Sequence, residues 1–112
     1  MARGSKDTAA KASARLFAAL GDETRLHLVS QLSAGGPASI ASLTAGSKLT
    51  RQAISKHLRV MEKARLIHRA RQGRESVCRL DPQSLNAAQQ GLELIAKQWD
   101  RALERLRAFV ED

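Results

Sequence analysis

Residues 50–67 read Thr50-Arg-Gln-Ala-Ile-Ser-Lys-His-Leu-Arg-Val-Met-Glu-Lys-Ala-Arg-Leu-Ile67. Within this segment Ile54, Leu58 and Met61 recur at spacings of four and three residues, which places them on one face of a helix. Thr50 is a good N-cap for that helix, because its hydroxyl oxygen can accept a hydrogen bond from a free N–H of the first turn. The pattern predicts an amphipathic helix over residues 51–64.

The opposite face of this helix carries cationic, amide and hydroxyl side chains. The major groove of DNA admits an α-helix, and side chains of these types read the edges of its base pairs. In helix-turn-helix motifs the residues near the start of the second helix do the reading. The expected DNA-contacting residues are therefore Thr50, Arg51, Gln52, Ser55, Lys56 and Arg59.

Positive charge is concentrated around the same helix. The 112 residues include 19 Lys+Arg and 11 Asp+Glu, which gives a formal net charge of +8. Residues 51–79 hold nine basic and two acidic side chains, a net +7, so the rest of the chain is nearly neutral. This segregation indicates a surface that binds a polyanion.

Three shorter segments surround this helix in the pattern of a compact DNA-binding unit. A helix with one apolar face is predicted from Ala12 to Leu20, and a second is predicted from an N-cap at Asp22 to about Ser33. A brief third helix is expected over residues 40–45, capped by Ser39. We expect the side chain of Arg25 to face inward and to find an internal carboxylate partner.

A β-hairpin is predicted over residues 66–80. Ile67 and Val77 have strand character, and a glycine-centred turn separates them. Arginines at the tip of such a hairpin would be costly to bury but are suited to contact with phosphates. The expected contacts at the tip are Arg71 and Arg74.

A long C-terminal helix is predicted over residues 83–110, with a heptad repeat. Eight of eight positions on one seam are apolar: Leu85, Leu92, Trp99 and Leu106, alternating with Ala88, Ile95, Ala102 and Phe109, and Leu103 widens the stripe. One interpretation is packing of the helix on its own domain. So small a domain has little core to cover the stripe, so we favour pairing with a second chain as a homodimer.

The order of these elements predicts a mainly α fold with a small β-hairpin, a dimeric winged helix-turn-helix of about five helices and a two-stranded wing. We expect a flexible N-terminal arm over residues 1–12, whose side chains are small and polar, and a single domain over residues 13–112. Two such domains related by a two-fold axis would bind an inverted-repeat operator in double-stranded DNA.

Three segments carry a resemblance to a known family. Residues 16–29 resemble the "LGDPTRLxIL" opening of the ArsR (arsenic-repressor-type) family of bacterial transcriptional regulators. Residues 50–67 resemble that family's "SxxSxHLxxLxxAGLV" block, and residues 69–75 match its "R(R/E)GR" wing. The resemblance implies a dimeric bacterial repressor whose first and last helices form the interface. It thus adds Phe17 to the interface, and it favours Gln52, Ser55, Lys56 and Arg59 as DNA contacts.

The chain departs from the family's metal sensors. Residues 38–47 contain no cysteine or histidine, and neither occurs from Pro82 onward. His27, His57 and His68 fall on three different elements without the spacing of a ligand set. We expect no metal site and no cofactor. The effector stays open: a small organic ligand between the terminal helices, a partner protein, or none.

Other functions remain as alternatives. Cys78 could serve a redox-responsive repressor, although a lone cysteine in a strand is more typical of a small apolar core residue. A basic winged helix could instead bind an acidic protein partner. We expect no enzyme, because the sequence contains no pattern typical of a carboxylate pair, a nucleophile–base set or a phosphate-binding glycine loop.

Composition narrows the class further. The single cysteine excludes an intramolecular disulfide. No apolar run reaches the roughly 18 residues of a membrane span, and residues 1–7 have charge but lack the apolar core of a secretion signal. We therefore expect a small basic protein in the cytoplasm, with no membrane partner.

Overall fold

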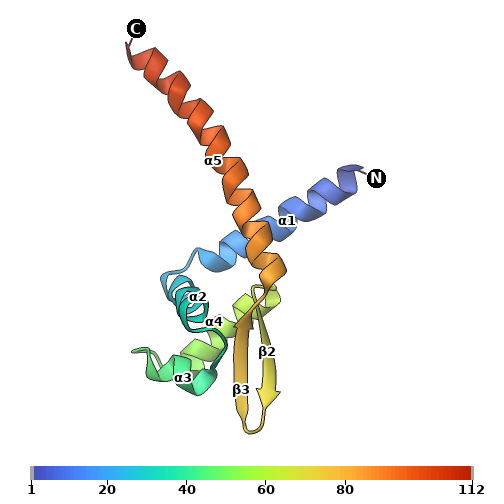
Figure 1. Ribbon diagram of the computed structural model, residues 1–112, viewed down its shortest axis with the longest axis vertical. Coiled ribbons are helices and arrows are strands. Elements are labelled where there is room, and N and C mark those ends of the chain that lie inside the picture. Colours follow the sequence, from blue (N-terminus) through green and yellow to red (C-terminus); the bar gives the residue numbers. More distant parts are fainter. Residues whose placement is uncertain (1, 112) are drawn as a thin grey trace.

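A computed structural model describes residues 2–111, with side chains for residues 11–111. It confirms a mainly helical fold with a small antiparallel sheet (Figure 1). In chain order the elements are α1 (Ala2–Leu20), α2 (Glu23–Gly35), β1 (Ala38–Ser39), α3 (Ile40–Ala45), α4 (Arg51–Lys63), β2 (Ile67–Gln72), β3 (Glu75–Leu80) and α5 (Pro82–Glu111).

The three predicted N-caps are confirmed. Asp22 Oδ2 accepts a hydrogen bond from the N–H of Arg25 at 3.0 Å and starts α2. Ser39 Oγ does the same for Ser42 at 3.0 Å at the start of α3. Thr50 Oγ1 accepts from the N–H of Ala53 at 3.1 Å and starts α4. Each cap satisfies an N–H that has no partner within its helix.

The core lies beneath α4. Its three predicted apolar-face residues, Ile54, Leu58 and Met61, are fully buried. Cys78 of β3 is also fully buried and belongs to the same cluster, where it behaves as a small apolar residue. Burial of one face of α4 directs the opposite face to solvent.

The sheet has three strands, one more than predicted. β2 and β3 form the expected hairpin, which turns through Gly73 at a φ of 64° that suits glycine. The additional strand is β1, which pairs with β3 through Ala38↔Cys78 and Ser39↔Val77. The sequence pattern did not reveal β1, because two residues are too few to show an alternation.

The first helix starts ten residues earlier than predicted. The sequence suggested a start at Ala12 and an arm before it, whereas the backbone is helical from Ala2. Alanine and lysine in this segment favour a helix, and no proline interrupts it. The flexibility expected for residues 1–12 stays a prediction.

The last helix extends well beyond the rest of the domain (Figure 1). Its 30 residues make it about 45 Å long at about 1.5 Å per residue, and the longest dimension of the molecule is 63 Å. Near the start of α5, helix α1 crosses α5 closely: a Cβ added at Gly91 would lie 3.3 Å from Cζ of Phe17. Gly91 therefore allows the close approach of the two helices.

Asp81 joins the hairpin to α5. Its Oδ1 accepts hydrogen bonds from the N–H groups of Gln83 (2.8 Å) and Ser84 (3.1 Å), which caps the helix. Its Oδ2 lies 2.6 Å from Nε2 of His68 on β2. The Ser84 N–H bond is the main cause that holds the pKa of Asp81 below its ordinary value of 3.8, and the His68 contact adds to it.

We expect Asp81→Asn to keep the N-cap of α5 and to remove the negative charge of residue 81. Asparagine caps helices as well as aspartate, so the loss of unfolding free energy at about pH 6 should stay below about 1 kcal/mol. Because the pKa of Asp81 is lower in the folded state, its charge stabilises the fold above pH 3.8 and stops doing so as the pH falls through the lowered pKa. Urea unfolding of both proteins across this range should show the difference closing on acidification. A difference that widens would contradict the assignment.

Candidate nucleic-acid interface

The outer face of α4 carries the predicted contact residues together. Arg51, Gln52, Lys56 and Arg59 are exposed, and Ser55 lies half-buried at their edge. These five line one shallow depression of about 430 Å³. Three cations, an amide and a hydroxyl thus share a solvent-facing surface that has the donors and acceptors needed to contact base edges and phosphates.

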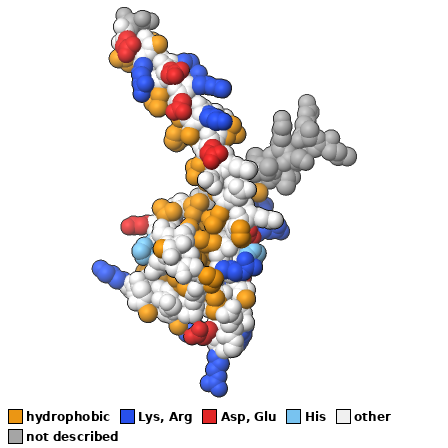
Figure 2. All heavy atoms as spheres, viewed as in Figure 1, with side chains coloured by type: hydrophobic (Ala, Val, Ile, Leu, Met, Phe, Trp, Pro, Cys, Tyr) orange, Lys and Arg blue, Asp and Glu red, His pale blue; other side chains and the backbone are white. Residues whose placement is uncertain are grey.

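The remaining predicted contacts lie apart from this depression. Thr50 is exposed at the start of α4, but its hydroxyl oxygen already serves the cap to Ala53. Arg71 and Arg74 are exposed on either side of the hairpin turn, at the end of the wing that lies away from α5. Basic side chains project from this tip at the bottom of Figure 2. The surface therefore has two parts, a helix face and a separate wing tip.

Arg25 of α2 links its helix to the end of α1 and to α4. Its Nε donates to the carbonyl of Ala19 at 2.7 Å, and Nη2 donates to that of Ala18 at 3.5 Å. Among the side chains of residues 11–111, no carboxylate forms a hydrogen bond or ion pair with its guanidinium, so the predicted carboxylate partner is replaced there by backbone carbonyls. The last carbonyls of a helix lack partners within it, and the guanidinium of Arg25 supplies donors to the C-terminal end of α1.

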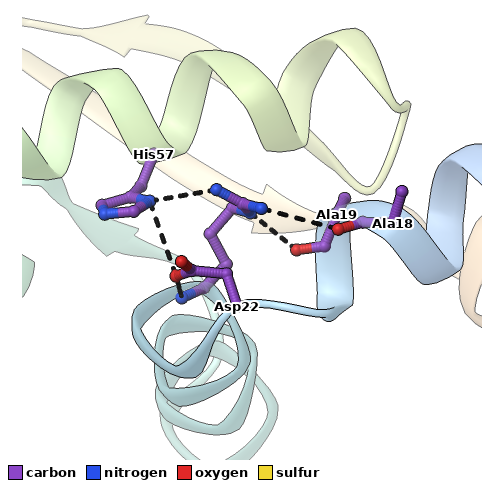
Figure 3. A network of polar contacts seen from close by, with 5 residues as sticks. Ala18, Ala19, Asp22 and His57 are labelled. Atoms are coloured by element: carbon purple, nitrogen blue, oxygen red, sulfur yellow. Dashed lines mark hydrogen bonds and ion pairs between the residues drawn. The ribbon is translucent and has the colours of Figure 1, made fainter.

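His57 connects this arrangement to α4. Its Nδ1 lies 3.3 Å from Nη1 of Arg25 and 3.7 Å from Oδ2 of Asp22 (Figure 3). The pKa of Asp22 is lowered mainly by the hydrogen bond from the backbone N–H of Arg25, and the charges of Arg25 and His57 lower it further. Three helices thus meet at one polar cluster. Sequence reasoning located the Asp22 cap but missed this link, because its partners are distant in sequence.

The heptad seam of α5 divides into two parts. Leu85 packs against the core of its own domain and Ala88 is buried in it, and Phe17 packs there as well, beside Gly91. Beyond them the seam emerges into solvent: Leu92 is 55% exposed, Trp99 65% and Phe109 81%. Figure 2 shows hydrophobic side chains continuing along this outer part of α5. Along this part Ile95 is half-buried, and Leu103 and Leu106 are exposed.

Histidine, cysteine and carboxylate side chains are the candidate metal ligands of this chain, and Cys78 is its candidate redox group. Among the described residues, no three His, Cys, Asp or Glu side chains gather so that they could hold a metal ion. Burial raises the pKa of Cys78, which disfavours the thiolate that oxidation requires. No helix within residues 2–111 is long and apolar enough to cross a membrane.

The fold and this surface define a class of protein. Two helices, α3 and α4, precede a basic hairpin, and α4 presents a polar outer face, which is the arrangement of a winged helix-turn-helix DNA-binding protein. Residues 20–70 match the family model described as a helix-turn-helix domain.

Known relatives identify the family. The HTH-type transcriptional regulator Rv2034 of Mycobacterium tuberculosis is 37% identical over 89 residues, which cover 80% of this chain and 79% of that protein. The structure of an ArsR-like transcriptional regulator from Rhodococcus sp. RHA1 is 34% identical, with a TM-score of 0.70 and coverage of 88% of this chain and 92% of that one. A further ArsR family regulator is 26% identical, also with a TM-score of 0.70, over 80% and 92% of the two chains. The chain belongs to the ArsR family and is a DNA-binding transcriptional regulator.

We expect Arg25→Lys to destabilise the protein although it keeps the charge. A single ammonium cannot reproduce the planar fork that reaches Ala19, Ala18 and His57. The free energy of unfolding should fall by about 1–2 kcal/mol, measured by urea unfolding. Arg59→Lys, the same change at an exposed site of α4, should alter it by less than about 0.5 kcal/mol. Equal effects at the two sites would contradict the role given to Arg25.

Proposed function

We propose that this protein is a homodimeric repressor that binds an inverted-repeat operator in double-stranded DNA. The observation that carries the proposal is the single depression on the outer face of α4, where Arg51, Gln52, Ser55, Lys56 and Arg59 lie together. The fold presents this face without burying any of its cations. α4 is accordingly the recognition helix, β2 and β3 form the wing, and α5 is the dimerisation helix.

The chemistry of the helix face fits the major groove. Arginine and lysine pair with the acceptors of guanine, and glutamine pairs with adenine. Gln52, Ser55, Lys56 and Arg59 supply these groups along the exposed side of α4. Arg51 and Thr50 lie at the start of the helix, where a phosphate is also favoured by the helix dipole. In this proposal Arg71 and Arg74 contact phosphates or the adjacent minor groove from the wing.

The uncovered part of α5 supports the dimer. Exposed apolar side chains that follow a heptad repeat are typical of a helix that pairs with another, and a contiguous apolar patch of this kind marks an interaction site. The proposed interface comprises the exposed Leu92, Trp99, Leu103, Leu106 and Phe109 together with the half-buried Phe17, Leu85 and Ile95. A two-fold axis between the chains would set the two recognition helices about one DNA turn, or 34–36 Å, apart.

The remaining parts of the proposal follow from this role. Residues 13–112 act as one domain, and the protein works in the cytoplasm, where bacterial DNA is found. We assign no catalytic activity and no cofactor.

We expect Lys56→Ala and Arg59→Ala each to weaken operator binding by about 1–3 kcal/mol. Both side chains are exposed, so the free energy of unfolding should change by less than about 0.5 kcal/mol. The measurement is fluorescence anisotropy against the protein's own promoter region and random duplex, at several salt concentrations. Affinity for the promoter should fall steeply with added salt.

The matched control is Lys97→Ala, which removes one charge from the exposed far side of α5. It should leave DNA affinity unchanged. A control as weak as the two variants would show that net charge alone drives binding. A wild-type protein with no preference among duplexes would overturn sequence-specific recognition and favour an acidic protein partner.

We expect Trp99→Glu to separate the dimer. It places a charge in the middle of the exposed seam, whereas Gln90→Glu adds the same charge on the opposite side of α5. Sedimentation velocity should show a monomer for the first variant and a dimer for the second, and only the first should lose operator binding. A monomeric wild-type protein would contradict the proposed interface.

A further inference from the structure

A second basic surface lies at the other end of the recognition helix. Lys11 and Arg15 of α1, Lys63 at the end of α4 and Arg65 beyond it line a cavity of about 690 Å³. Buried Leu16 and Ile67 also line the cavity. A volume of this size is within the range of small-molecule sites, about 300–1,000 Å³.

This cavity is well separated from the proposed DNA surface. α4 is about 20 Å long, since its 13 residues each advance by about 1.5 Å. The DNA-facing residues occupy its first two-thirds, and the cavity lies at its C-terminal end, beside the base of the wing and the start of α5. Figure 1 shows α1 and α5 crossing above this point. DNA held against the start of α4 and the wing tip does not account for these cations.

The two carboxylates that line the cavity do not neutralise its four cations. Glu62 is paired with Arg69, whose Nη2 lies 3.2 Å from Oε1. The carboxylate of Asp81 contacts His68 and accepts hydrogen bonds from the N–H groups at the start of α5. Among the side chains of residues 11–111, none of the four cations forms an ion pair with a carboxylate.

Two features of this cavity lower the stability of the fold. Lys11 and Arg15 are four residues apart on one helix, a spacing at which like charges repel. Arg65 has a φ of 62°, and it is the one non-glycine residue with a positive φ in residues 2–111. Glycine would take this conformation without the steric penalty of a Cβ. The N–H groups of Arg65 and Leu66 donate to the carbonyls of Glu62 and Met61, which ends α4 in a turn where glycine is the usual residue. An arginine thus stands here despite that penalty.

We infer that this cavity binds a small organic dianion, through carboxylate or phosphate groups held by Arg15, Arg65 and the two lysines. Guanidinium groups match the geometry of both anions through paired hydrogen bonds. A bound dianion would offset the repulsion among the four cations. Apolar surface from Leu16 and Ile67 would contact the carbon skeleton of the ligand.

The test is a titration of the ¹⁵N-labelled wild-type protein, without DNA, followed by amide chemical shifts at constant ionic strength. Succinate and glycerol 3-phosphate are the dianionic probes, and acetate is the monoanionic control. We expect saturable shifts for residues 65–68 and Ser84 with at least one dianion, at a dissociation constant of about 1 mM or lower, and none with acetate. The stronger dianion identifies carboxylate or phosphate as the preferred group.

Arg65→Gly separates a binding role from a structural one. It should weaken binding of the preferred dianion at least fivefold and should not lower the melting temperature, because glycine relieves the strain at this position. Arg15→Gln should also weaken binding, whereas Arg101→Gln, the same change on exposed α5, should not. Operator affinity should be unchanged in Arg65→Gly.

Four outcomes of the titrations would overturn the inference. These are the absence of saturable shifts with either dianion, shifts centred on residues 51–59 or the wing tip, unaltered binding in Arg65→Gly, and equal losses in Arg101→Gln. Loss of operator binding in Arg65→Gly would assign the cavity to the DNA surface instead. Because the titration contains no DNA, its failure is distinct from a failure of the repressor proposal.

Discussion

Burial of Ile54, Leu58 and Met61 is the constraint on which the rest of the molecule depends. The three side chains fix the rotation of α4 about its own axis, so the polar residues of the opposite face must point to solvent. The wing depends on the same core, since Ile67 and Cys78 pack in the same cluster. A change that rotated α4 would therefore displace both parts of the DNA surface at once.

Polar contacts add to the apolar core in positioning α4. Hydrophobic packing is not directional, and it leaves α4 free to shift along its neighbours by small amounts. Within the Arg25–His57–Asp22 cluster, the hydrogen bonds of Arg25 limit such shifts, because hydrogen bonds require particular distances and angles. It ties the C-terminal end of α1, the start of α2 and the middle of α4 to one another. The recognition surface is thus positioned relative to α1, the helix that crosses α5.

The sequence predicted the elements defined by local chemistry and missed those defined by distant contacts. Periodicity located α4, side-chain oxygens located three caps, and a glycine turn located the wing. β1 was missed because its strand character comes only from pairing with β3. The partners of Arg25 were missed because they are backbone carbonyls. Charge counting placed one basic surface over residues 51–79. The structure divides it, since Lys63 and Arg65 lie at the end of α4 away from the depression on its outer face.

The separation of the basic cavity from the outer face of α4 bears on how a signal could reach the DNA surface. Arg15 and Phe17 are two residues apart on α1, about 160° around the helix, so the cavity and the proposed dimer contact use opposite sides of one element. A ligand changes DNA affinity only if it binds the free and DNA-bound states with different free energies. For a ligand in the cavity to act as a signal, its free energy of binding would have to differ between these two states. Its walls are α1, the end of α4 and the start of α5, and Arg25 and His57 link the first two. A shift of α4 on DNA would alter the spacing of Arg15 and Lys63, which line the cavity from α1 and α4.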